Sequence, residues 1–522
     1  MNNSKIKNVS KNILFAVFSN VLGLFLSFIV RRIFILQLGS EYVGLNSLFI
    51  NVLGVLSFAE LGIGVAVTAS LYAPISQDNF SLIRAYLEFY RKFMNFVALF
   101  VEIMGIIVGL FIPFLIHNQS SFSAFQLWLY FVLFTTSSAV SYLLTYKRIL
   151  LTADQADYIS SSNNLVFKIV IAIFQIFFLT CWRSYVLYLI TQICFILLSN
   201  IVINRKINLM YGHIFHSNEK QTLGEEERRG LKKDIVGMIS AKVGGIILTS
   251  SDNIMISMFL GLGILGRYAN YAMLISGASL VLNQIFSSLT PSIGNYRFVS
   301  KHVDSIDELT VFERILKINY LLVIIASIAL SLYVSIFVKI WLSSKFILPN
   351  IVAILIIVNF AVNQFRQVVI VFMSAYGLFW QQRFKSILEA LINIVLSIFL
   401  LAFTNLGILS VLMGTIVTNV GFNLTWEFLI VKRHAIKNID VKNYFVQYVL
   451  ILCFIIGVVI MNLKISWIIM AGFTTLFSFY TLSIIFILEL FIIIVFVSVF
   501  SKDVFHYMKS KVSNFFNNST YN

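Results

Sequence analysis

Charged residues and cysteines are scarce in this sequence. Only 11% of the 522 residues are charged and 59% are hydrophobic, whereas a soluble domain is about half apolar and a quarter charged. This balance excludes an ordinary soluble protein. The three cysteines, Cys181, Cys194 and Cys453, stand in or beside apolar runs without a CxxC pair, so the sequence indicates neither a disulfide framework nor a metal site.

The sequence also lacks the motifs of common catalytic sites. It contains no P-loop, so this chain does not carry an ATPase. No Ser/His/Asp constellation stands out from the loops, and His213 and His216 lack the further ligands that a metal site needs. We therefore expect no enzyme activity, no cofactor and no bound metal.

Long apolar segments are abundant in the sequence. Phe alone occurs 51 times, and the mean hydropathy is +0.92. Apolar runs of about twenty residues, long enough to cross a bilayer as helices, recur from end to end and do not alternate as barrel strands do. We predict an all-α polytopic membrane protein with about fourteen transmembrane helices, drawn at 13–36, 43–66, 93–116, 124–146, 159–182, 185–204, 235–259, 267–290, 314–338, 350–373, 385–404, 408–431, 444–463 and 470–499.

The net charge of +16 has a distribution that argues against nucleic-acid binding. Most of the 38 Lys and Arg residues fall in short loops between spans, as membrane orientation requires. An even number of spans with both termini in the cytoplasm fits this distribution best. The basic N-terminus, MNNSKIKNVSKN, leads into an apolar run without a small-residue cleavage site, and we interpret it as the start of an uncleaved first span.

An internal repeat with an offset of 222 residues divides the chain. The turn LGSEYVG, which starts at Leu38, aligns with LGLGILG, which starts at Leu260, and Gly23 then falls on Gly245. We predict a six-helix lobe with a cytoplasmic linker at 1–222, a second six-helix lobe at 223–444, and two extra helices with a basic cytoplasmic tail at 445–522. Six spans per unit make the repeat parallel, and transporters of this kind carry substrate at the interface of the halves.

Arg366 is the clearest charge inside a predicted span. It lies about ten residues from the cytoplasmic end, near mid-depth at about 1.5 Å per residue. Asn359, Asn363 and Arg366 share one helix face. Since a charge in hydrocarbon costs at least about 2.5–3.5 kcal/mol, we expect this polar stripe to face a solvated cavity. A buried structural pair is the alternative.

Other cations stand within spans or at their ends. Lys242 and Asp252 fall near one face of the seventh span but are too far apart to pair along the helix, so each needs a partner or water elsewhere. Lys168 has two readings, a cavity residue or a side chain that snorkels to the inner surface. The sequence thus offers two further candidate cations for a transport path.

The first span carries an arginine pair near its outer end. Arg31 and Arg32 run counter to the positive-inside pattern there, although both could snorkel to the outer surface. Asn20, Ser27 and Arg31 share a helix face, so Asn20 is a further candidate for a polar cavity lining. Adjacent residues point about 100° apart, so at most one arginine faces a cavity.

Acidic residues also stand inside the predicted spans. Glu102 and Glu389 are candidates for pairing with bases or for binding a coupling cation, and Asp252 and Glu60 are further candidates for coupling. We expect Glu60 and Glu427 to be interfacial, because both stand near cytoplasmic ends. These acids are compatible with transport that is coupled to H⁺, to Na⁺ or to the membrane potential.

Several segments resemble one transporter family. The opening hairpin with LGSEYVGLNSLF, ELGIG and LYAP, the segment SSDNIMISMFLGLGILGRYANY, and SAYG at 374–377 are similar to the Wzx-type polysaccharide flippases of the MOP superfamily. The resemblance covers about 10–440 and implies two six-helix lobes as in MATE exporters, with two C-terminal helices as in some relatives. It implies an oligosaccharide on a polyprenyl diphosphate as substrate, moved to the outer leaflet of a bacterial cytoplasmic membrane. Arg31 and Arg32 are the nearest counterparts of important cavity arginines in peptidoglycan-precursor flippases.

The hypothesis is therefore a lipid-linked-oligosaccharide flippase with a cationic path. Arg31, Lys242 and Arg366 would bind the diphosphate, with Arg32 and Lys168 secondary, because arginine chelates phosphate groups. We expect a monomeric transport unit among membrane lipids, with a polysaccharide polymerase and assembly proteins as partners and no nucleic acid. The alternatives are a MATE-like exporter of cationic drugs, whose cavity would be dominated by acids, and a membrane-bound glycan polymerase, which would need a long catalytic outer loop.

Overall fold

The protein is helical throughout the part of the chain that its computed structural model describes. The described residues are 3–57, 63–117, 121–216, 223–225, 229, 250–290, 292–294, 308–378, 380–382 and 384–500, and they contain no strand. Twelve of the helices in these ranges are long and apolar enough to cross a membrane. The predicted fold class, an all-α polytopic membrane protein, is confirmed.

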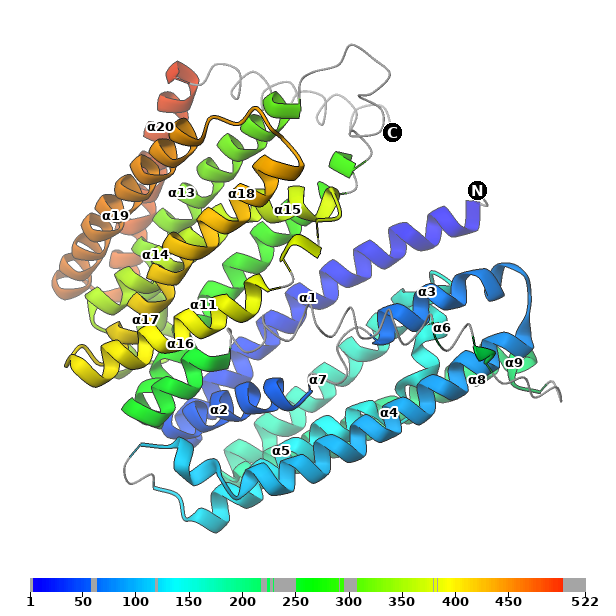
Figure 1. Ribbon diagram of the computed structural model, residues 1–522. Helices are drawn as coiled ribbons and strands as arrows, with labels where there is room; N and C mark the ends of the chain where they lie inside the picture. The colour runs from blue at the N-terminus through cyan, green and yellow to red at the C-terminus, as the bar shows by residue number, and fades with distance from the viewer. Residues whose placement is uncertain are drawn as a thin grey trace. The chain divides into compact units, whose positions relative to one another are not determined.

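The first of two compact units comprises residues 1–266. Its long helices pack side by side, α1 against α7, α4 against α5, and α7 and α5 against α8 (Figure 1). Aromatic and aliphatic side chains between them form the cores of this unit. The helices are α1 (Asn3–Leu38), α2 (Ser40–Leu56), α3 (Ile63–Ser76), α4 (Phe80–Gly109), α5 (Ala124–Tyr142), α6 (Arg148–Ala153), α7 (Asp157–Trp182), α8 (Tyr185–Met210) and α9 (Gly212–His216).

The second unit comprises residues 267–522. Here α13 packs against α14, α19 and α20, and α14 packs against α17. The helix from 408 to 434 is interrupted by a π-helical turn, Thr418–Asn423, between α17 and α18. The helices are α11 (Leu262–Ser287), which begins in the first unit, α13 (Glu308–Trp341), α14 (Asn350–Phe365), α15 (Gln367–Ala375), α16 (Lys385–Phe403), α17 (Ile408–Val417), α18 (Leu424–His434), α19 (Val441–Gly472) and α20 (Thr475–Phe500).

Local sequence explains where several of these helices begin. Ser123 precedes α5 and forms a capping box with Gln126, whose backbone N–H donates to the Ser123 hydroxyl at 3.2 Å. Asn79, Ser184 and Asp440 each accept a backbone N–H at the starts of α4, α8 and α19. Such caps satisfy donors that would otherwise be left unpaired at a helix end.

Twelve of the predicted spans correspond to the twelve long helices. The span predicted at 43–66 is instead the short apolar helix α2, which ends at Leu56, and the span predicted at 235–259 lies mostly outside the described residues. The long apolar run after Trp467 is divided between α19, which ends at Gly472, and α20, which begins at Thr475. The run therefore contributes residues to two helices and does not form a single span.

The repeated turns have the same backbone geometry. Gly39 has φ 94° and Gly261 has φ 87°, in the region that favours glycine, and they stand 222 residues apart. The helix that follows begins at Ser40 in one copy and at Leu262 in the other. These positions agree with the predicted offset, while the lobe boundaries at 222 and 444 stay predictions.

Two further glycines of the repeated turns make close backbone contacts, both inside the first unit. A Cβ on Gly44 would overlap the carbonyl oxygen of Leu262, and a Cβ on Gly266 would overlap the carbonyl oxygen of Ser40. The two contacts are reciprocal under the repeat, because Ser40 corresponds to Leu262 and Gly44 to Gly266. A substitution that adds a side chain at either position therefore requires the neighbouring backbone to shift.

Gly44→Ala is expected to lower the stability of the folded protein, although alanine is the better helix former. Overpacking costs about 1–3 kcal/mol, which exceeds the gain of about 1 kcal/mol from replacing a helical glycine. Thermal unfolding in detergent measures the change. Gly263→Ala, in the same turn but with no atom within 4 Å of its Cβ, is the control, and equal stability of both variants would contradict the close packing.

Candidate functional site: a polar cavity beside a buried ion cluster

A cavity of about 680 Å³ lies in the second unit, lined by α11, α14 and the helices beside them. Its polar lining consists of hydroxyl and amide side chains, and none of the described lining residues is charged. Tyr268 and Phe360 add aromatic surface. The polar residues are Ser276, Ser279, Asn283, Gln284, Ser287, Asn359, Asn363 and Gln367.

Helical spacing explains how these side chains meet. On α11, Ser276, Ser279, Asn283 and Ser287 recur at intervals of three and four residues, which places them on one helix face. Such a stripe is costly against lipid, so polar residues in membrane spans face a protein interior or a cavity. The α11 stripe was not among the predicted site residues, although the spacing of its hydroxyl and amide residues was a usable signal.

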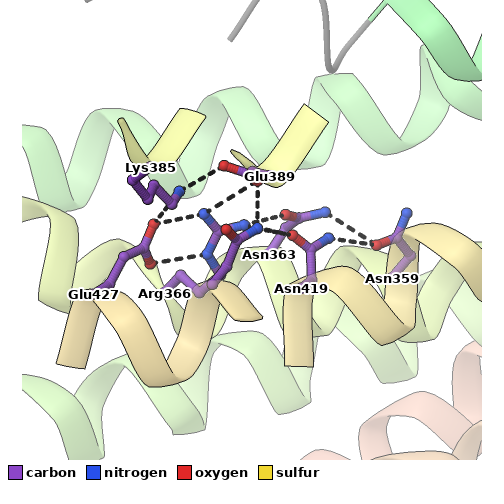
Figure 2. Close-up of polar contacts among 8 residues, drawn as sticks. Asn359, Asn363, Arg366, Lys385, Glu389, Asn419 and Glu427 are labelled. Carbon is purple, nitrogen blue, oxygen red and sulfur yellow. Dashed lines mark hydrogen bonds and ion pairs between the residues drawn. The ribbon is translucent and has the colours of Figure 1, made fainter. Parts of the chain in front are cut away.

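A buried ion cluster contacts Asn363, one of the residues that line this cavity (Figure 2). Arg366 binds the Glu427 carboxylate with two hydrogen bonds, Nη2 to Oε1 at 2.6 Å and Nε to Oε2 at 3.0 Å. Lys385 Nζ donates to the same Oε1 at 2.6 Å. The paired arrangement is the strong, bidentate form of the arginine–carboxylate interaction.

Glu389 completes the cluster. Its Oε2 lies 2.7 Å from Lys385 Nζ, and its Oε1 lies 3.8 Å from Arg366 Nη2. Arg366 is 7% exposed and Glu427 2%. Two cations and two carboxylates therefore balance inside the protein, which is the arrangement that a buried charge requires.

Two helix interruptions bring these groups together. Arg366 stands at the junction of α14 and α15, and the π-helical turn lies between α17 and α18. The turn contributes Asn419, which accepts from Arg366 Nη1 at 2.7 Å, and Asn423, which donates to Glu389. π-Helical turns occur frequently at functional sites.

Amide side chains connect the ion cluster to the cavity. Asn363 lines the cavity and accepts from Arg366 Nη1 at 3.3 Å. Asn359 also lines it and accepts from Asn419 Nδ2 at 3.2 Å (Figure 2). The cluster thus holds in place two of the amides that the cavity presents.

The predicted stripe on α14 divides in two in the structure. Asn359 and Asn363 line the cavity, whereas Arg366 forms a buried pair, which was the alternative expectation. Glu427 is buried and paired with Arg366 and Lys385, whereas its expected interfacial depth stays a prediction. Lys385 was not a candidate, although its i, i+4 spacing to Glu389 was a usable signal.

The remaining candidate residues that are described in the first unit belong neither to the cavity lining nor to the ion cluster. Arg31 is partly buried and interacts electrostatically with Tyr185 and Tyr188 of α8, whereas Arg32 on the same helix is exposed. Lys168 is exposed on α7, with Nζ beside Gly23 of α1. Asn20 on α1 is exposed as well. Their role in binding stays a prediction.

The candidate coupling acids have different surroundings. Thr136 of α5 donates to Glu102 of α4 at 2.8 Å, and Asp252 is partly buried. Glu389 is engaged in the ion cluster. Lys242 and Glu60 lie outside the described residues.

Solved transporters share this fold. An inward-facing multidrug-resistance transporter of the MATE family, from the MOP superfamily, aligns with a TM-score of 0.63 at 11% identity, over 79% of this chain and 96% of the transporter. The lipid II flippase MurJ in its inward closed conformation aligns with a TM-score of 0.58 at 14% identity, over 94% and 99%. The Vibrio cholerae MATE transporter VcmN in the bent form aligns with a TM-score of 0.52 at 13% identity, over 82% and 98%.

No protein-family model matches the sequence, and no curated protein matches it significantly. At identities of 11–14% the likeness concerns the fold. The chain accordingly has the same helical fold as these solved transporters.

Proposed function

We propose that this protein is a flippase for polyprenyl-diphosphate-linked oligosaccharides. It moves them from the inner to the outer leaflet of the bacterial cytoplasmic membrane by alternating access between two lobes, for cell-surface polysaccharide synthesis. The observation that supports this best is the uncharged cavity of hydroxyl and amide groups within membrane helices. Sugar hydroxyls both donate and accept hydrogen bonds, and amide and hydroxyl side chains match them in both roles.

The chemistry of the cavity favours a sugar over a cationic drug. A cation entering low dielectric needs a carboxylate, and none of the described lining residues supplies one. The nearby carboxylates, Glu427 and Glu389, are already balanced by Arg366 and Lys385. The similar fold of the lipid II flippase, aligned over 94% of this chain, is consistent with a lipid-linked substrate whose tail stays in the bilayer.

Asn283→Leu is expected to slow glycan export about fivefold. The substitution removes one amide from the cavity, and a hydrogen bond contributes about 1 kcal/mol net, which corresponds to that factor. Export of surface polysaccharide in cells that depend on this protein measures the change. Gln447→Leu on α19 removes an amide that does not line the cavity and is the control.

The same cells distinguish the two transport functions. The flippase proposal predicts that loss of the protein stops polysaccharide export and leaves resistance to cationic drugs unchanged. Normal export together with increased drug sensitivity would overturn the proposal in favour of the drug exporter.

A further inference from the structure

The hydrogen bonds that connect the ion cluster to the cavity have a fixed direction. Arg366 sets this direction, because a guanidinium donates hydrogen bonds and cannot accept them. Its Nη1 donates to Asn363 Oδ1 at 3.3 Å and to Asn419 Oδ1 at 2.7 Å. The oxygen of each amide must therefore face Arg366, and the NH2 group of each amide must point away from it.

Both amides donate to the same acceptor, Asn359 Oδ1 (Figure 2). Asn363 Nδ2 reaches it from the next turn of α14 at 3.2 Å, and Asn419 Nδ2 reaches it from the π-helical turn, also at 3.2 Å. A carbonyl oxygen has two lone pairs, so these two donors saturate it. We call Asn363, Asn419 and Asn359 the amide relay.

A second group with a fixed role supports the direction of the relay. Glu389, paired with Lys385 at 2.7 Å, is a carboxylate that only accepts hydrogen bonds. Asn423 donates to Glu389, and its NH2 group also donates to Asn419 Oδ1 at 2.7 Å. Reversing the Asn419 amide would break its hydrogen bonds with both Arg366 and Asn423. Because Asn419 is only 3% exposed, these buried donors would be left unpaired at a high cost.

Asn359 therefore presents N–H groups to the cavity. It lines the cavity and is partly buried, and within the described part of the chain its Nδ2 has no hydrogen-bond partner. The amide cannot offer its oxygen to the cavity without breaking two hydrogen bonds. The hydroxyl groups of Ser276 and Ser279, which also line the cavity, can rotate and can both donate and accept. Asn359 differs from them as a donor of fixed direction.

We propose that Asn359 is a specificity-determining residue that selects a saccharide carrying an acetamido group. The carbonyl oxygen of this group only accepts hydrogen bonds and so suits a fixed donor, whereas a sugar hydroxyl fits a donor or an acceptor equally. A carboxylate oxygen also only accepts, but its charge would be costly beside cations that Glu427 and Glu389 already balance. The inference rests on the proposed function, since it places a saccharide in the cavity.

Binding of three synthetic lipids to the full-length protein in nanodiscs tests this assignment. The probes are farnesyl diphosphate linked to N-acetylglucosamine, to glucose and to glucuronic acid. The wild type is expected to bind the N-acetylglucosamine probe about fivefold tighter than the glucose probe, which is the ratio that one net hydrogen bond provides. Equal binding of these two probes, or tightest binding of the glucuronic acid probe, would overturn the assignment.

Asn359→Leu is expected to reduce the preference for N-acetylglucosamine to less than twofold, because leucine removes the fixed donors. Asn283→Leu is the matched control. Asn283 lines the same cavity and forms no hydrogen bond with the amide relay within the described ranges, so its loss should weaken both probes equally. Asn359→Ala replaces the leucine variant if that variant does not fold. A preference that persists without the Asn359 amide, or that disappears in Asn283→Leu, would contradict the proposal.

Asn363→Asp tests whether the relay positions Asn359. A carboxylate still accepts from Arg366 but cannot donate to Asn359, so the Asn359 amide is no longer held in one direction. We expect the preference to fall below twofold while the glucose probe binds within about threefold of the wild type. A purely structural role of Asn363 would change the binding of both probes together, and this result or an unchanged preference would overturn the relay.

The outcomes also separate this inference from the proposed function. Equal binding of the three probes by a protein that flips lipid-linked saccharides would overturn the acetamido preference alone. If the protein flips no lipid-linked saccharide but still binds the N-acetylglucosamine probe about fivefold tighter than the glucose probe, the proposed function fails and the selectivity of Asn359 stands.

Discussion

Glu427→Gln is expected to leave little folded protein in the membrane. The substitution keeps the size of the side chain but removes the charge that balances Arg366 and Lys385, at 2.6 Å from both. Only Glu389 of the cluster's carboxylates then remains for two buried cations. Breaking a buried pair by removing one partner costs about 3–5 kcal/mol, a large part of the 5–15 kcal/mol that typically stabilises a protein.

Size-exclusion chromatography of the expressed protein and its thermal unfolding in detergent measure this effect. Glu88→Gln is the matched control, because Glu88 also pairs with an arginine, Arg91, at 2.8 Å, but at an exposed position. Such surface pairs contribute about 0–1 kcal/mol. Adding Lys385→Met to Glu427→Gln removes one of the two cations and is expected to recover part of the stability. A Glu427→Gln variant as stable as the wild type would contradict the cluster.

Ser279→Trp is expected to abolish transport while the protein still folds. Ser279 lies on the polar face of α11 and lines the cavity. An indole ring at this position would fill part of the cavity and block substrate binding there. The cavity of about 680 Å³ provides space for the ring beside Ser279. We expect export to fall at least tenfold, which corresponds to about 1.4 kcal/mol or more.

Val281→Trp is the control for this prediction. Val281 stands two residues further on the same helix, is 59% exposed and does not line the cavity. A tryptophan at this exposed position lies outside the cavity, so we expect transport within about twofold of the wild type. Equal activity of the two variants would show that substrate does not enter this cavity.

Much of the fold could be predicted from the sequence, because hydrophobic length alone specifies a membrane helix. Twelve of the fourteen predicted spans correspond to long apolar helices, and the glycine turns at Gly39 and Gly261 share one backbone conformation. The helix interruptions could not be predicted in this way. The break at Arg366 and the π-helical turn Thr418–Asn423 lie inside apolar runs that read as continuous helices.

These interruptions also explain which part of the site was missed. Arg366 could be identified as a mid-membrane cation and its neighbours Asn359 and Asn363 as polar lining. Its partner Glu427 is 61 residues away in the sequence, and an ion pair of that separation depends on tertiary structure. Helix periodicity reports which residues share a face but does not report what that face contacts.

A reconstituted flipping assay tests the central claim most directly. Purified protein is placed in proteoliposomes with a fluorescent polyprenyl-diphosphate-linked oligosaccharide, and the label that reaches the opposite leaflet is measured. We predict protein-dependent movement of this lipid, at least tenfold slower with Ser279→Trp and unchanged with Val281→Trp. Movement of a cationic dye instead of the lipid-linked oligosaccharide would contradict the account.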